Sequence, residues 1–172
     1  MKIRESGMSL IELMIVIAMV GLLIVILSNA YGNWSERYRV ETEVKEFYAD
    51  LMDVRARAMQ RNRGHFVVLS GVGLQYTRYI VYEDTNPGPD GDGALTVGGD
   101  NVVKDVSPRY PVVTFPAGTT QVLVNRDGTL SLNNVTIRVP PPGAVQADYD
   151  CIALSRTRIK MGRYDGASCV EK

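Results

Sequence analysis

Few residues in this 172-residue chain have side chains suited to catalysis or metal binding. The chain holds two cysteines, Cys151 and Cys169, and a single histidine, His65. A structural zinc site needs four cysteine or histidine ligands, and a cysteine nucleophile needs an adjacent base. Those partners are missing, since the cysteines form no Cys-x-x-Cys motif and the histidine stands alone. GxSxG, Walker and dinucleotide-binding motifs are also missing, so we predict no enzyme, no metal site and no cofactor.

One carboxylate is informative because of its surroundings. Glu12 is the only charged residue in an apolar run that extends from Met8 to Leu27. An acid at the centre of a membrane costs about 2.5 to 3.5 kcal/mol, less near the interface, and usually has a partner. Cleavage between Gly7 and Met8 would create an α-amino group one helical turn away. The two charges could then pair within one chain, or between neighbouring copies as a device that sets their register.

Four basic residues near the C-terminus form a candidate binding surface. They occur within one short segment that holds no acid, and they are Arg156, Arg158, Lys160 and Arg163. In a β-strand the first three would share one face. We favour the interpretation that this face is solvated or binds an acidic neighbour electrostatically. The alternative is that it binds the phosphate backbone of DNA.

The apolar run is long enough to cross a membrane. As a helix, the twenty residues from Met8 to Leu27 span roughly 30 Å. Lys2 and Arg4 precede the run, so we expect residues 1–7 in the cytoplasm and the C-terminal part in the periplasm. The prediction is a single-pass inner-membrane protein. A secretory signal cleaved after Ala30, releasing a soluble binding protein, is the competing interpretation.

The helical pattern continues beyond the apolar run. Apolar residues recur at spacings of three and four, as on one face of an amphipathic helix, at Val40, Val44, Phe47, Leu51, Val54 and Ala58. No proline or turn cluster separates this stripe from the apolar run. We therefore predict one helix from near Met8 to Arg63, with Gly64 as its C-cap.

Short runs rich in Val, Ile, Tyr and Thr follow, separated by turn residues. They predict strands at residues 65–70, 74–83, 112–115, 121–125, 129–132, 135–139, 149–154 and 157–161. The expected fold class is α+β, with one long N-terminal helix packed on an antiparallel β-sheet or β-sandwich. We divide the chain into leader 1–7, membrane and assembly helix 8–29, and periplasmic domain 30–172, the last comprising helix 30–63 and β domain 64–172.

The stretch from Glu83 to Asp105 is irregular and acidic, with six acids against one lysine. It fails the EF-hand pattern because Pro89 stands where the loop requires glycine. We predict a solvated excursion between strands, with a calcium site of another type as the alternative. Over the whole chain the net charge is zero, with 45% hydrophobic and 22% charged residues. That composition is typical of a folded protein and argues against wholesale nucleic-acid binding.

The N-terminal residues resemble the class III signal of type IV pilins and pseudopilins. The resemblance rests on a basic leader, a glycine and an acid at a fixed offset ahead of an apolar helix, here Lys2-Ile3-Arg4-Glu5-Ser6-Gly7 followed by Met8-Ser9-Leu10-Ile11-Glu12-Leu13. In that family a prepilin peptidase cuts after the glycine and methylates the new amino terminus. Glu12 would be the fifth residue of the mature chain. Met8 replaces the more common Phe, and the helix-kinking proline of many pilins is missing.

Two further segments, 82–93 and 155–163, resemble parts of minor pilins of the FimT/GspH type, some of which bind DNA for uptake. The resemblance implies a minor subunit that is cleaved after Gly7 and assembled through its helix into a type IV pilus or a type II secretion pseudopilus. Its implied partners are other pilin subunits, prepilin peptidase and the inner membrane. An oxidising periplasm, and the disulfide-closed C-terminal loops common in pilins, together predict a Cys151–Cys169 disulfide.

Overall fold

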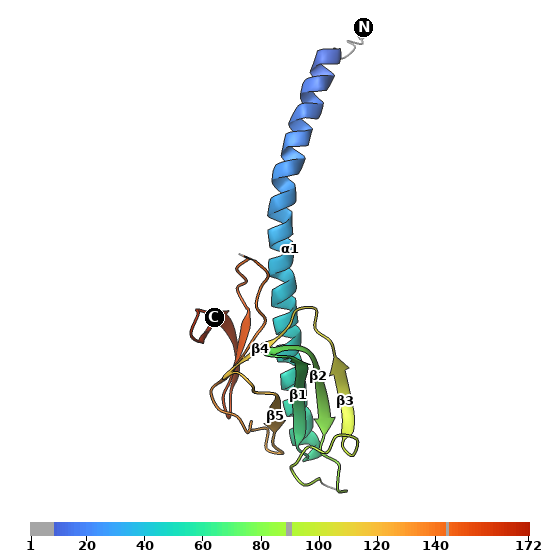
Figure 1. Cartoon of the computed structure of the whole chain (residues 1–172), viewed down its shortest axis with the longest axis vertical. Helices are drawn as coiled ribbons and strands as arrows, with labels where there is room; N and C mark the ends of the chain where they lie inside the picture. The colour runs from blue at the N-terminus through green and yellow to red at the C-terminus, as the bar shows by residue number, and fades with distance from the viewer. Residues whose placement is uncertain (1–8, 89–90, 144) are drawn as a thin grey trace, which may run out of the picture. The chain divides into compact units, whose positions relative to one another are not determined.

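The computed structural model describes residues 9–88, 91–143 and 145–172 (Figure 1). The chain divides into two compact units, Met1–Glu36 and Arg37–Lys172. The described elements are one helix followed by strands, namely α1 (Leu10–Arg61), β1 (His65–Val72), β2 (Gln75–Glu83), β3 (Asn101–Val106), β4 (Val113–Phe115), β5 (Gln121–Val124), β6 (Val135–Arg138), β7 (Cys151–Leu154), β8 (Ile159–Tyr164) and β9 (Cys169–Glu171).

The first unit contains the apolar part of α1. From Leu10 to Leu27 every residue is exposed, and an 18-residue window reaches a mean hydropathy of 3.1 with none of it buried inside the protein. By length and composition this segment can cross a membrane. A helix that is apolar all round is stable only where lipid or other protein covers it.

In the second unit, the predicted stripe on α1 is confirmed. Its six residues are buried and share one core with residues of both sheets. Aromatic packing reinforces this contact, because the rings of Phe47 and Tyr79 meet edge to face with centroids 4.6 Å apart. Beside them, the Tyr79 hydroxyl donates a hydrogen bond to Asp50 Oδ2 at 2.6 Å. The fold class is therefore α+β, as predicted.

The C-terminal end of α1 differs from the prediction. The helix ends at Arg61, and Asn62 takes a left-handed conformation with φ 53°. The backbone N–H of Arg63 donates to the carbonyl oxygen of Ala58 at 3.2 Å, which is the bond of a Schellman motif. Asn62 therefore caps the helix, and the prediction that Gly64 does so is wrong.

The strands form two antiparallel sheets, in the orders β3-β2-β1-β5 and β4-β6-β7-β8-β9. The predicted strand at 129–132 is wrong, since Leu130 forms only an isolated bridge with Val124. Two strands were not predicted. β3 is an edge strand without a fully buried residue, so its sequence lacks an apolar alternation, and β9 has only three residues.

Three buried carboxylates hold the acidic stretch from Glu83 to Asp105 together, although most of its described residues are exposed. Glu83 is 2% exposed and accepts hydrogen bonds from Arg61 at 2.5 Å and Arg63 at 3.4 Å. Two further buried carboxylates, Asp84 and Asp100, bind backbone N–H groups of the loop. The predicted solvated excursion therefore agrees with the exposure of most of the stretch, while its three buried carboxylates find the donors that burial requires.

Those two carboxylates organise the loop in the same way. Asp84 accepts from the N–H groups of Asp92 at 3.3 Å and Gly93 at 2.8 Å. Asp100 accepts from three N–H groups, those of Thr85 at 3.0 Å, Asn86 at 3.1 Å and Thr96 at 2.7 Å. Gly91 has φ 74°, and a Cβ there would lie 2.0 Å from the Asp84 carboxylate. Glycine is therefore required where the loop passes this side chain.

His65 begins β1 and is fully buried between Glu83 of β2 and Val124 of β5. Its Nδ1 lies 3.2 Å from the carbonyl oxygen of Arg63, so this nitrogen carries the proton and donates it. Its Nε2 has no hydrogen-bond partner among the described residues. Burial lowers the pKa of His65, because the charged imidazolium is poorly solvated there.

We expect the stability of a truncated protein that contains the second unit, residues 35–172 (hereafter the domain 35–172), to fall as the pH drops from about 7.5 to 5.5. In the unfolded chain the imidazole takes up a proton near its reference pKa of about 6.5, whereas the buried ring resists it. The free energy of unfolding should then fall by at most about 1.4 kcal/mol per pH unit. Urea denaturation at a series of pH values measures this. The variant His65→Asn keeps a side-chain N–H but does not titrate in this range, so its free energy of unfolding should depend less on pH. The same pH dependence in this variant would assign the effect to other groups.

Candidate functional site

Glu12 lies in the first turn of α1, in the first unit. Its neighbours Leu10, Ile11 and Leu13 are all exposed apolar side chains. The N–H groups of the first turn give a helix a positive end, which favours an acid at this position. Gly7 and Met8, the predicted processing residues, lie outside the described residues. Pairing between Glu12 and an amine at Met8 therefore stays a prediction.

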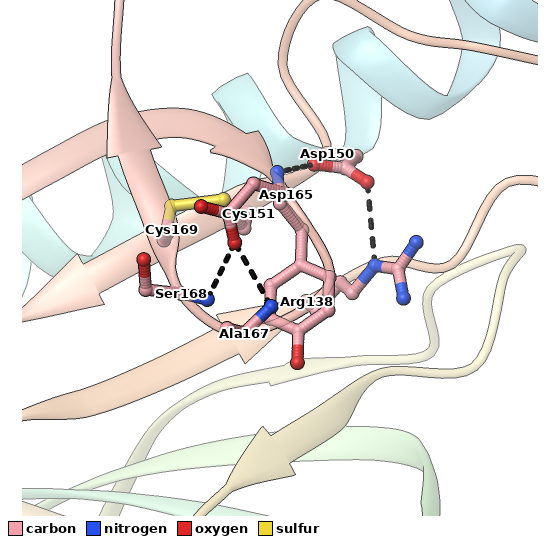
Figure 2. Close-up of a disulfide and its surroundings, with 8 residues drawn as sticks. Arg138, Asp150, Cys151, Asp165, Ala167, Ser168 and Cys169 are labelled. Atoms are coloured by element: carbon pink, nitrogen blue, oxygen red, sulfur yellow. Dashed lines mark hydrogen bonds and ion pairs between the residues drawn. A yellow bond between two sulfur atoms is a disulfide. The ribbon is translucent and has the colours of Figure 1, made fainter.

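The predicted disulfide is confirmed. Cys151 of β7 and Cys169 of β9 are joined by an S–S bond of 2.04 Å, with their Cα atoms 5.9 Å apart (Figure 2). Strand β8 pairs with both β7 and β9, so the disulfide links the two strands that flank β8 at one edge of the second sheet. Gly162 is needed in this strand, because a Cβ there would lie 2.1 Å from the carbonyl oxygen of Val170.

A network of hydrogen bonds fixes the chain around the disulfide (Figure 2). The buried Asp150 accepts from Arg138 Nε at 3.3 Å and from the backbone N–H of Tyr164 at 2.6 Å. Asp165 accepts from the N–H groups of Ala167 at 2.9 Å and Ser168 at 2.8 Å. These backbone donors lower the pKa of Asp165, because they favour its ionised form. The C-terminal hairpin is thus fixed by both covalent and polar contacts.

The prediction that Arg156, Arg158 and Lys160 share one strand face is wrong. Ser155 and Arg158 close a turn through mutual backbone hydrogen bonds of 2.9 and 3.3 Å, and β8 begins only at Ile159. A turn forms here because the strands β7 and β8 are antiparallel neighbours that must be connected. Arg156 and Arg158 are exposed on this turn.

The other two cations lie within β8 and have partners. Lys160 forms an ion pair with Glu171 of β9, and Arg163 donates to the side-chain oxygen of Gln146 at 2.6 Å. The predicted basic surface is therefore reduced to Arg156 and Arg158. We also considered the acidic stretch 83–105 of another copy as the acidic neighbour of this surface. Three of its acids, Glu83, Asp84 and Asp100, are buried and bonded within their own chain, which weakens that interpretation. Among the described residues no group of three or more His, Cys, Asp or Glu side chains could hold a metal ion.

Sequence reasoning missed two features of the surface. A groove lies over strands β4, β6, β7, β8 and β9, lined by residues that include Phe115, Thr136, Ala153, Lys160 and Cys169. These residues come from separate strands, so only the sheet register brings them together. The second feature is an exposed aromatic pair on α1, Tyr31 and Trp34. Their spacing of three, directly after the apolar run, was the available signal.

Comparison with known proteins supports the resemblance at two levels. Residues 2–28 match the family model of the prokaryotic N-terminal methylation motif. No curated protein sequence matches this chain. The chain is similar in structure to the type IV minor pilin FimU of Pseudomonas aeruginosa, with 14% identity, 76% of this chain and 99% of that chain covered, and a TM-score of 0.55.

A second solved structure has a similar fold. The minor pseudopilin EpsH from the type 2 secretion system of Vibrio cholerae matches with 10% identity, 76% of this chain and 99% of that chain covered, and a TM-score of 0.50. The leader motif and the fold thus both agree with the predicted resemblance to type IV pilins and pseudopilins. The finer prediction of a FimT/GspH type stays a prediction.

We expect removal of the disulfide by Cys151→Ser/Cys169→Ser to lower the free energy of unfolding of the domain 35–172 by about 3 kcal/mol. The bond restricts the unfolded chain by closing a loop across a sequence separation of 18 residues. Urea denaturation under oxidising conditions measures the difference. Reduction of the wild-type domain should reproduce it and should leave the double variant unchanged. Equal midpoints for the oxidised wild type and the variant would contradict the prediction.

Proposed function

We propose that this chain is a minor subunit of a type IV pilus or of a type II secretion pseudopilus, assembled through the apolar part of α1. The observation that carries the proposal is the methylation motif at residues 2–28, which runs into an exposed apolar helix. The β domain, with the fold of a minor pilin and a minor pseudopilin, supports it independently. The proposed role is structural, and a non-enzymatic role agrees with this shared fold.

The proposed maturation begins in the inner membrane, with the C-terminal domain in the periplasm. Prepilin peptidase cuts after Gly7 and methylates the amine of Met8. That amine would lie one helical turn from Glu12, so each charge has a counter-ion of opposite sign nearby. The periplasmic location is supported by the Cys151–Cys169 disulfide, since such bonds persist in oxidising compartments.

Assembly follows from the apolar surface that α1 exposes. Helices from other pilin subunits can cover the segment Leu10–Leu27 once the subunit leaves the lipid. Apolar contacts alone do not define how far one helix slides along the next. Pairing of the Met8 amine with the Glu12 carboxylate of a neighbour does, because a wrong register leaves both charges unpaired in an apolar environment.

Replacement of Glu12 tests this role. Glu12→Ala should insert in the membrane and be cleaved normally, yet fail to enter filaments, because the charge that sets register is lost. The measurement is the amount of the subunit in sheared filaments and in membranes. Glu12→Asp keeps the charge and serves as the matched control, for which we expect substantial incorporation. Wild-type incorporation of Glu12→Ala would remove Glu12 from the mechanism.

Mass spectrometry of the same preparations tests processing. A mature chain that begins at a methylated Met8 agrees with the proposal. A chain that begins at Tyr31 would instead support the alternative of a secreted soluble binding protein cleaved after Ala30.

DNA capture is the second candidate function, and the exposure of Arg156 and Arg158 on the β7–β8 turn favours it. Two phosphate contacts predict that the logarithm of the binding constant falls with the logarithm of salt concentration with a slope of about −2. Arg156→Ala/Arg158→Ala in the domain 35–172 should abolish this binding. Lys160→Ala/Arg163→Ala, whose cations already have partners, is the matched control and should retain most of it. Binding without salt dependence, or equal loss in both variants, would exclude this use of the turn.

A further inference from the structure

An aromatic pair follows the apolar part of α1 in the first unit. The rings of Tyr31 and Trp34 have centroids 6.1 Å apart, and the two residues are 67% and 61% exposed. Because they are three positions apart, they lie on the same side of the helix. Each combines an apolar ring with a polar N–H or O–H group. Side chains of this kind are enriched where lipid hydrocarbon meets the headgroups.

The distance from Glu12 to this pair matches a bilayer. Trp34 lies 22 positions after Glu12 on the same helix, which corresponds to about 33 Å. The hydrocarbon core of a bilayer is about 30 Å thick. A modest helix tilt brings the two values together. The acid and the indole can therefore lie at opposite hydrocarbon boundaries at the same time.

We propose that, in the unassembled subunit, Tyr31 and Trp34 bind the outer headgroup boundary of the bilayer and thereby hold Glu12 at the inner boundary. The occupant of this surface is lipid. The proposal rests on the membrane-inserted precursor proposed above, and adds the depth at which that precursor lies.

The competing placement centres the apolar segment itself. With the midpoint of Leu10–Leu27 at the bilayer centre, Glu12 lies about 5 Å inside the hydrocarbon and Trp34 about 8 Å outside it. That placement dehydrates a carboxylate and leaves the Trp34 ring beyond the headgroups, in water. Moving the helix about 7 Å toward the cytoplasm removes both costs. The residue at the bilayer centre then becomes Leu23 instead of one near Ala18.

The two placements can be distinguished because Trp34 is the only tryptophan of the chain. Reporters Ala18→Trp and Leu23→Trp are made separately in full chains that also carry Trp34→Tyr, which keeps an amphipathic aromatic ring at the anchor. Each chain is reconstituted into phosphatidylethanolamine and phosphatidylglycerol vesicles whose acyl chains are brominated at one defined depth. Quenching of tryptophan fluorescence is then compared across bromine depths.

The expected result is that bromines near the methyl ends of the acyl chains, at the bilayer centre, quench the Leu23 reporter more strongly than the Ala18 reporter. The native Trp34 should be quenched most by bromines nearest the headgroups. The reverse order of the two reporters would overturn the anchor while leaving membrane insertion intact. Absence of quenching for both reporters would instead contradict the proposed membrane-inserted precursor.

A matched variant tests the aromatic pair directly. Tyr31→Ala/Trp34→Ala removes the anchor, so the helix should shift outward by about 7 Å and the Ala18 reporter should become the deeper of the two. If the Leu23 reporter stays deeper in this variant, the aromatic side chains do not set the depth and the proposal fails.

Discussion

The apolar surface of α1 between Leu10 and Leu27 is the constraint on which the rest of the structure depends. Covering a single Leu, Ile, Val or Met side chain is favourable by about 1.5 to 3 kcal/mol, and this segment consists almost entirely of such residues. Water is therefore excluded as its long-term environment. In the proposed function, lipid covers it before assembly and neighbouring helices cover it afterwards.

The second part of the same helix is covered by its own chain instead. From Val40 onward only one face of α1 is apolar, and the residues of that face are buried with both sheets in a single core. Because both parts belong to one continuous helix, the proposed passage from lipid to filament requires no refolding of the β domain. The disulfide and the hydrogen bonds of the buried Asp150 fix the β7–β9 end of the second sheet in one arrangement.

The features predicted correctly from the sequence are those that local periodicity or a local motif encodes. The stripe from Val40 to Ala58 specified a helix face, and alternating Val, Ile and Tyr residues specified most strands. Predictions failed where tertiary contacts override local pattern. Arg156 and Arg158 alternate as in a strand, but the connection between β7 and β8 needs its turn there. In the sequence, Asp84 and Asp100 cannot be distinguished from solvated loop acids. Only the folded loop brings the backbone N–H groups to them that make their burial possible.

Glu12 connects the two environments of the helix. At the inner hydrocarbon boundary, where we propose that it lies before assembly, its carboxylate would keep contact with water and headgroups and would carry little of the penalty for a charge in lipid. The proposed transfer into a filament would move this carboxylate into apolar surroundings, and the comparable penalty at the centre of a membrane is about 2.5 to 3.5 kcal/mol. An amine from Met8 can offset it, but only in a register that brings the opposite charges together. The Glu12 carboxylate would therefore cost little free energy in the membrane, yet it would make a wrong register between packed helices unfavourable.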